Sequence, residues 1–151
     1  MGIIMQHMFQ QALSEKSSRK DVVEMLTEYG ITPTQQRIVI AQELLSRPQH
    51  LSADQVLQRV NAHANTVSKA TVYNTLGLFS EKGLIREVIV DSTKVFYDSN
   101  TKPHHHFYDI ESGNLHDIES AELAIEGLPE PPLSMEITDI DVIVRVSPKA
   151  R

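Results

Sequence analysis

Apolar residues in the first part of the chain recur with the period of an α-helix. Val22, Leu26 and Tyr29 fall on one helical face and Gly30 follows, which predicts a helix over 21–29. Three further segments repeat this pattern, and each follows a residue whose hydroxyl can cap a helix. The first has Thr32 as its cap and Pro33 as its first helical residue, ends at Arg47-Pro48, and turns Ile38, Ala41, Leu44 and Leu45 inward. The second follows Ser52 and turns Val56, Leu57 and Val60 inward. The third follows Ser68, ends at Gly83, and turns Val72, Leu76 and Phe79 inward.

The period changes after Gly83. Residues 84–90 and 94–97 are rich in β-forming residues, and Asp91-Ser92-Thr93 separates them, so a β-hairpin is predicted. Short helices followed by a hairpin are the order of a winged helix-turn-helix, whose last helix enters a groove of DNA. We therefore expect residues 1–98 to form a winged-helix DNA-binding domain, with 1–17 as a polar, weakly helical N-terminal extension.

A second, smaller domain is expected after a polar linker at 99–103. The pattern predicts strands at 104–110 and 114–118 around a turn at 111–114, a short helix at 120–127, a stiff proline-rich connector at 129–132 and a third strand at 135–146. A domain of about fifty residues buries too little surface to be stable alone, so 104–151 is expected to form a homodimer. The predicted fold class is α+β: an N-terminal winged helix-turn-helix followed by a small α/β dimerisation domain.

The charge of the chain is divided unevenly between these parts. Residues 1–90 carry nine Lys/Arg and eight Asp/Glu (+1), and residues 91–151 carry five and twelve (−7), which together give the net charge of −6. The first part is thus compatible with DNA if its cations cluster, and the second suits a bound cation. The absence of cysteine excludes disulfides, thiolate nucleophiles and thiol redox sensing.

The chain is expected to be a cytoplasmic protein without membrane contact. No apolar run approaches the roughly 18 residues that span a membrane. The start of the chain, Met1 to Met8, lacks the basic region of a signal peptide.

Three consecutive histidines, His104-His105-His106, open the second predicted domain. In an extended segment side chains alternate between faces, so His104 and His106 point one way and His105 the other. A His-x-His pair on one face of a strand suits a divalent metal or the axial position of haem iron. An exposed polar strand is the alternative interpretation of the same residues.

Several motifs in fixed order resemble the ferric uptake regulator family. They are Gly30-Ile31-Thr32-Pro33-Thr34-Gln35-Gln36-Arg37, His50-Leu51-Ser52-Ala53-Asp54, Ala70-Thr71-Val72-Tyr73-Asn74-Thr75-Leu76, Glu81-Lys82-Gly83-Leu84-Ile85 and the histidine run. The resemblance covers roughly residues 18–118 and implies a dimeric, metal-responsive winged-helix transcription factor. Within the family the chain is most similar to the iron response regulator (Irr) branch, because it has no cysteine, the triple histidine, Tyr73-Asn74, and a tail containing Leu128-Pro129-Glu130-Pro131-Pro132.

Double-stranded promoter DNA is the partner that this resemblance implies. The helix that follows Ser68 would present five outward residues near its N-terminal end, where such helices meet bases: Ser68, Lys69, Thr71, Tyr73 and Asn74. Asn74 can pair with adenine, whereas Lys69 and Arg37 suit phosphates. Arg37 has a structural interpretation as well, which is to brace its helix by pairing with a carboxylate.

The family pattern, carried over residue by residue, implies a regulatory metal site. It would draw on His50, Asp91, His104, His106 and Asp117, a set of nitrogen and oxygen ligands that suits Fe(II) or Mn(II) and tolerates Zn(II). In the Irr branch the triple histidine resembles a haem-binding element, so His104, His105 and His106 are also the expected haem ligands. Glu111 and His116 are candidates for a second site, and His7 and His63 are expected at the surface.

The function expected from these observations is sequence-specific transcriptional regulation of iron and haem homeostasis, controlled by metal, haem or both. The alternative within the family is a Mn(II)/Fe(II) sensor or a peroxide sensor without haem control. A metal-dependent hydrolase using His104, His106 and Asp117 would need a general base in a cleft, and no catalytic motif is recognisable, so no enzyme is expected. A metal-storage protein would need many more histidine clusters.

Overall fold

The computed structural model describes residues 18–62 and 67–150 of the 151-residue chain. The chain divides into two compact units, Met1–Thr101 and Lys102–Arg151. This division falls inside the linker that the sequence predicts at 99–103. The predicted N-terminal extension and the histidines His7 and His63 lie outside the described residues.

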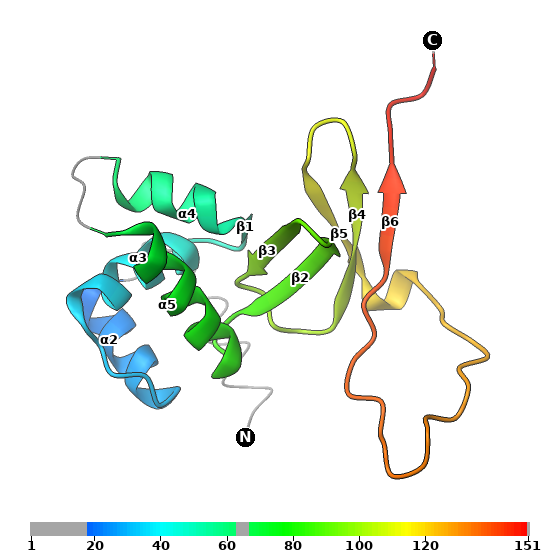
Figure 1. The fold of residues 1–151 in the computed structure, drawn as a ribbon, viewed down its shortest axis with the longest axis horizontal. Coiled ribbons are helices and arrows are strands. Elements are labelled where there is room, and N and C mark those ends of the chain that lie inside the picture. Colours follow the sequence, from blue (N-terminus) through cyan, green and yellow to red (C-terminus); the bar gives the residue numbers. More distant parts are fainter. Residues whose placement is uncertain (1–17, 63–66, 151) are drawn as a thin grey trace. The chain divides into compact units, whose positions relative to one another are not determined.

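Four helices form the first unit where it is described (Figure 1): α2 (Arg19–Glu28), α3 (Gln35–Leu45), α4 (Ala53–Val60) and α5 (Lys69–Glu81). Each begins after a hydroxyl residue whose oxygen accepts a backbone N–H of the first turn, namely Ser18, Thr34, Ser52 and Ser68. The sequence-based assignment of Thr32 as the cap of α3 was wrong. Thr34 has the extended backbone of a cap and accepts from the Arg37 N–H, so Pro33 precedes the helix.

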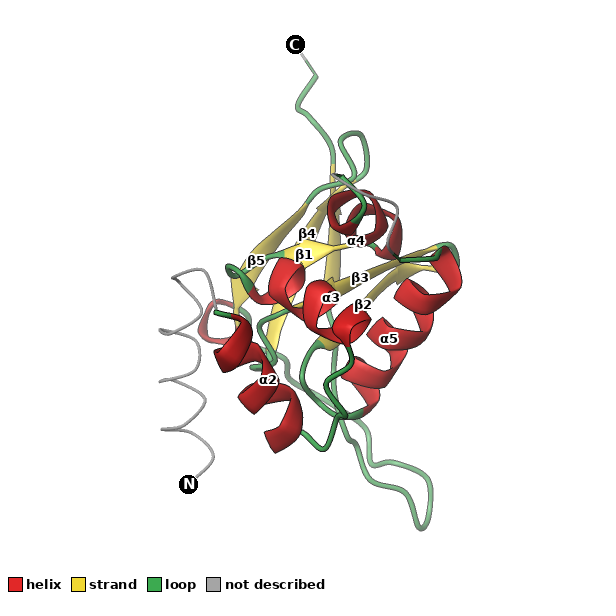
Figure 2. Cartoon of the chain, turned by 90° about the vertical axis from the view of Figure 1, so that its left-hand side faces the viewer, coloured by secondary structure: helices red, strands yellow, loops and turns green. Residues whose placement is uncertain are grey.

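The core of the first unit is built around α3, which contacts α2, α4 and α5 (Figure 2). The inward residues that the periodicity predicts are buried here, among them Val22, Leu26, Ile38, Leu44, Val56, Val72, Leu76 and Phe79. Burial of such side chains contributes about 1.5–3 kcal/mol each, so the apolar periodicity determines which face of every helix turns inward.

A three-stranded antiparallel sheet completes the first unit. Its strands are β1 (His50–Leu51), β2 (Arg86–Asp91) and β3 (Lys94–Asp98), in the order β1-β3-β2. The hairpin β2–β3 agrees with the predicted one, whereas β1 was not predicted because two residues carry no alternation. Gly83, at φ 78°, ends α5 and allows the Leu84 N–H to bind the Phe79 carbonyl, which turns the chain into β2.

The second unit contains a three-stranded sheet formed by β4 (His104–Asp109), β5 (Leu115–Glu119) and β6 (Ile143–Val146). Its order is β5-β4-β6, with β5 antiparallel and β6 parallel to β4 (Figure 1). The histidine run is therefore the start of the central strand.

Two sequence predictions for the second unit were wrong in extent. The helix expected at 120–127 is only a 3₁₀ turn, Ser120–Glu122, and the strand expected at 135–146 is confined to Ile143–Val146. Segments this short are not stable as helices without an apolar face to bury, and Ile125, Met135 and Ile137 are exposed in the described chain. None of the helices within the described ranges is long and apolar enough to cross a membrane.

The capping box of α4 gives a first prediction. The Ser52 hydroxyl accepts the Gln55 N–H, and the Gln55 side chain accepts the Ser52 N–H. Ser52→Ala should lower the free energy of unfolding by about 1 kcal/mol, measured by urea denaturation. Ser52→Thr, which keeps the hydroxyl, is the control, and equal stability of the alanine variant would contradict the role of the cap.

The turn between β4 and β5 gives a second prediction. Two hydrogen bonds lower the pKa of the Asp109 carboxyl below its ordinary value of 3.8. The Ser112 hydroxyl has the larger effect, and the Glu111 N–H has the smaller one. A depressed pKa stabilises the fold above the ordinary value, and this contribution is lost as the pH falls through the lowered one. Ser112→Ala should raise the pKa of Asp109 toward 3.8 in an NMR titration, and an unchanged pKa would exclude the hydroxyl as its cause.

Candidate functional site

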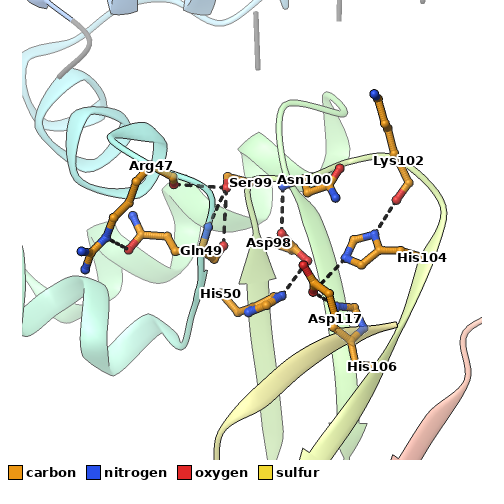
Figure 3. Close-up of polar contacts among 10 residues, drawn as sticks. All are labelled: Arg47, Gln49, His50, Asp98, Ser99, Asn100, Lys102, His104, His106 and Asp117. Atoms are coloured by element: carbon orange, nitrogen blue, oxygen red, sulfur yellow. Dashed lines mark hydrogen bonds and ion pairs between the residues drawn. The ribbon is translucent and has the colours of Figure 1, made fainter. Parts of the chain in front are cut away.

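Strand register brings three ligating side chains together in the second unit. His104 and His106 lie two residues apart on β4 and share a face, and His106 stands opposite Asp117 of β5. The Nε2 atoms of His104 and His106 lie 3.5 Å and 3.4 Å from Oδ1 of Asp117. The sequence predicted these three residues for the metal site, and the structure brings them together (Figure 3).

The hydrogen bond at the far side of His104 determines what its Nε2 can do. Nδ1 of His104 lies 2.6 Å from the carbonyl oxygen of Lys102. A carbonyl only accepts, so the proton is on Nδ1, and in the neutral ring Nε2 carries a lone pair. That lone pair faces the Asp117 carboxylate, which is also an acceptor. Two acceptors that face each other repel unless a proton donor or a metal ion lies between them, and this set of ligand atoms suits a divalent metal.

A second pair of ligating side chains lies in the first unit. His50 of β1 pairs in register with Asp98 of β3, and its Nε2 lies 3.2 Å from Oδ2 of Asp98. The other Asp98 oxygen accepts the Asn100 N–H at 2.8 Å, which orients the carboxylate toward His50 (Figure 3). His50 and Asp98 are thus fixed by the sheet that the unpredicted strand β1 creates.

Asp98, rather than the expected Asp91, accompanies His50 in this sheet. Asp91 lies at the tip of the β2–β3 hairpin, opposite Lys94. Asp98 lies opposite Arg86, which is five residues before Asp91 on β2. At about 3.3 Å per residue, the two carboxylates are separated by some 17 Å along the sheet. The Thr93 hydroxyl and N–H bind Asp91 and lower the pKa of its carboxyl. Asp91 therefore closes the turn of the hairpin.

His105 has a different environment from its two neighbours. Its Nδ1 accepts the backbone N–H of Val142 at 3.1 Å, and the His106 N–H donates to the Val142 carbonyl. The middle histidine of the run thus holds the chain at the start of β6. Of the three histidines expected to bind haem, His104 and His105 thus each have a ring nitrogen bonded to the backbone.

The candidates for a second site do not come together. Within the described residues, neither Glu111 nor His116 joins a group of three or more ligating side chains. Glu111 lies in the turn where its N–H binds Asp109, and His116 stands on β5 opposite Phe107, on the face away from Asp117.

The N-terminal turns of α5 present the side chains expected to meet DNA. Lys69, Tyr73 and Asn74 are exposed, and Ser68 caps the helix and binds the Thr71 hydroxyl. Sequence reasoning overlooked Asp54 of α4. Its Oδ1 lies 3.4 Å from the Tyr73 hydroxyl and 3.9 Å from Nζ of Lys69, and that ammonium lies 5.7 Å from the centre of the Tyr73 ring.

Arg37 has the structural role that the sequence left open, with a different partner. Its guanidinium donates to a backbone carbonyl, that of Thr32, at 2.9 Å. The side chain thus fastens the loop before α3 to the first turn of that helix.

Comparison with known proteins agrees with this arrangement. The sequence profile of the ferric uptake regulator family matches residues 28–130. The peroxide-responsive repressor PerR of Staphylococcus aureus (strain Mu50) is 30% identical over 124 residues, which cover 82% of this chain and 80% of the repressor.

Two solved structures share the fold. The ferric uptake regulator of Pseudomonas aeruginosa with manganese has a TM-score of 0.63 and 23% identity, covering 84% of this chain and 97% of its own. That of Francisella tularensis with iron has a TM-score of 0.64 and 23% identity, covering 80% and 93%. The family match and the 30% identical relative establish that the chain belongs to the ferric uptake regulator family, whose members are transcription regulators and not enzymes.

Proposed function

We propose that this chain is a DNA-binding transcription regulator whose affinity for promoter DNA is controlled by a divalent metal. The observation that carries the proposal is the convergence of the Nε2 atoms of His104 and His106 on one carboxylate oxygen of Asp117, a donor set that suits a divalent metal. The first unit is the winged-helix DNA-binding domain of this proposal, with α5 as the helix that enters the major groove.

In the proposal one ion takes ligands from both units: His50 and Asp98 from the first, and His104, His106 and Asp117 from the second. The support is chemical and topological. Neither set by itself fills the coordination shell of Fe(II) or Mn(II), and only five residues, 99–103, separate Asp98 from His104. A connection this short keeps the two sets at a high effective concentration. Binding then favours the arrangement of the units in which both sets reach the ion.

Fe(II) or Mn(II) is the proposed ion, with Zn(II) as a further candidate. The ligands are imidazole nitrogens and carboxylate oxygens without sulfur, which suits these metals. Relatives of the same fold are described with manganese and with iron. We also propose a homodimer formed through the second unit, because that unit exposes a series of apolar side chains, namely Ile125, Leu128, Leu133, Met135 and Ile137, that a second copy would cover.

The third prediction tests metal control. Metal-stripped protein is titrated with Mn(II), Fe(II) or haem while its affinity for a DNA duplex is followed by fluorescence anisotropy. The duplex is selected from a random-sequence pool by the Mn(II)-loaded protein. His106→Ala should weaken Mn(II) binding about tenfold or more and abolish the metal-dependent gain in DNA affinity.

His116→Ala is the matched control, because His116 lies on the neighbouring strand and outside the cluster. The proposal is wrong if wild-type protein binds the duplex equally with and without metal. Haem titration tests the control that the Irr resemblance implies: release of DNA by haem in the Mn(II)-loaded wild-type protein, together with loss of haem binding in His106→Ala, would make haem the effector at the same histidines.

A peroxide-responsive regulator is the second candidate function, favoured by the 30% identity to the peroxide-responsive repressor of S. aureus. The same assay separates the two. Hydrogen peroxide should release DNA from the Fe(II)-loaded protein and add one oxygen atom to a ligand histidine, detected by mass spectrometry, while the Mn(II)-loaded protein stays bound. Equal resistance of both forms would exclude peroxide sensing.

The fourth prediction concerns Asp54, whose carboxylate forms an ion pair with Lys69 and accepts a hydrogen bond from Tyr73 of α5. A carboxylate at a DNA-binding surface repels phosphates, and this one also pairs with the Lys69 ammonium, which could otherwise neutralise a phosphate. Asp54→Asn should therefore raise nonspecific DNA affinity and steepen its dependence on salt by about one counterion. Glu122→Gln, with the same charge change in the second unit, is the control, and an unchanged salt slope for Asp54→Asn would refute the effect.

A further inference from the structure

Gln49, the residue before His50, joins the end of α3 to its surroundings. Its Nε2 donates to the backbone carbonyls of Glu43 and Leu44, each at 2.9 Å. These carbonyls belong to the last turn of α3, where no following N–H continues the helix. The carboxamide therefore acts as a side-chain cap at the C-terminal end of α3.

The oxygen of the same carboxamide connects to α4. Oε1 of Gln49 accepts from the guanidinium of Arg59 at 2.9 Å and from Nε of Arg47 at 3.4 Å. Arg59 also lies 3.6 Å from the carboxylate of Glu43. Both donors and the acceptor of the carboxamide are thus engaged, which fixes its orientation and leaves it no alternative rotamer with the same partners.

The backbone of Gln49 is held by Ser99, next to the ligand pair. The Gln49 N–H donates to Oγ of Ser99 at 3.1 Å, and the Ser99 N–H donates to the Gln49 carbonyl at 3.3 Å (Figure 3). One position further along, His50 stands opposite Asp98 in the β1–β3 pairing. The two candidate metal ligands and the Gln49–Ser99 pair are therefore adjacent rungs of the same ladder.

We propose that Gln49 is a positioning residue that transmits metal binding at His50 and Asp98 to helices α3 and α4. This inference rests on the proposed function. A displacement of His50 toward a metal moves the neighbouring Gln49, whose carboxamide holds the end of α3 and Arg59 of α4. Helix α4 contacts α5 and carries Asp54, which holds two DNA-facing side chains of α5. The connection from metal ligand to DNA surface thus consists of named contacts within one unit.

The fifth prediction tests this connection with Gln49→Met, which keeps the length of the side chain and removes its hydrogen bonds. The variant should retain its fold, judged by circular dichroism, while the gain in DNA affinity caused by Mn(II) falls about threefold or more. Gln58→Met is the matched control, since Gln58 is an exposed glutamine of α4. The duplex is the one selected by the Mn(II)-loaded wild-type protein.

A second readout does not depend on DNA. Mn(II) should slow amide hydrogen exchange in α4 of the wild-type protein but not of Gln49→Met. If Gln49→Met is unstable, Arg59→Met breaks the link to α4 and leaves the cap of α3 intact, with Glu43→Gln as the control for the lost ion pair. A folded Gln49→Met or Arg59→Met variant with the wild-type gain and exchange pattern overturns the proposal. If the wild-type protein shows no Mn(II)-dependent gain in DNA affinity, the proposed function itself is overturned. That result is obtained with the wild-type protein alone, so it is distinct from the results for the two variants.

Discussion

The structure of the candidate site depends on one constraint: two acceptor atoms that face each other repel unless a proton donor or a metal ion lies between them. His104 cannot turn its protonated nitrogen toward Asp117, because the Lys102 carbonyl holds that proton on the other side of the ring. Strand pairing then places His106 and Asp117 around the same point. Sheet register, a property of the backbone, thus determines the electrostatic requirement of the site.

The division of the histidine run follows from the same alternation. His104 and His106 face Asp117, and His105 uses its ring to hold Val142 before β6. The run therefore combines ligand chemistry on one face with a structural contact on the other. This explains why three consecutive histidines yield one cluster of ligands instead of a flexible chelating segment.

Much of the fold could be predicted from the sequence because its signals are local. Apolar periodicity located α2, and hydroxyl caps together with periodicity located α4 and α5. Alternation along the strand predicted that His104 and His106 share a face. Long-range pairings could not be predicted in this way. Asp98 reaches His50 only because a two-residue strand joins the hairpin, and nothing in the local sequence distinguishes Asp98 from Asp91. The tail was overestimated because its apolar residues are exposed instead of buried in the sheet.

The exposed surface at the N-terminal end of α5 is short, which limits the number of base pairs that it can span. Residues 68–74 extend over about 9 Å of helix, which corresponds to roughly three base pairs at 3.4 Å each. A three-base-pair sequence recurs about once in every 64 positions, whereas a genome presents about 10⁶ or more competing sites. In the proposed function, one copy of this helix would therefore match about one site in 64, and selection of a single promoter would require the same few contacts to be repeated along the DNA.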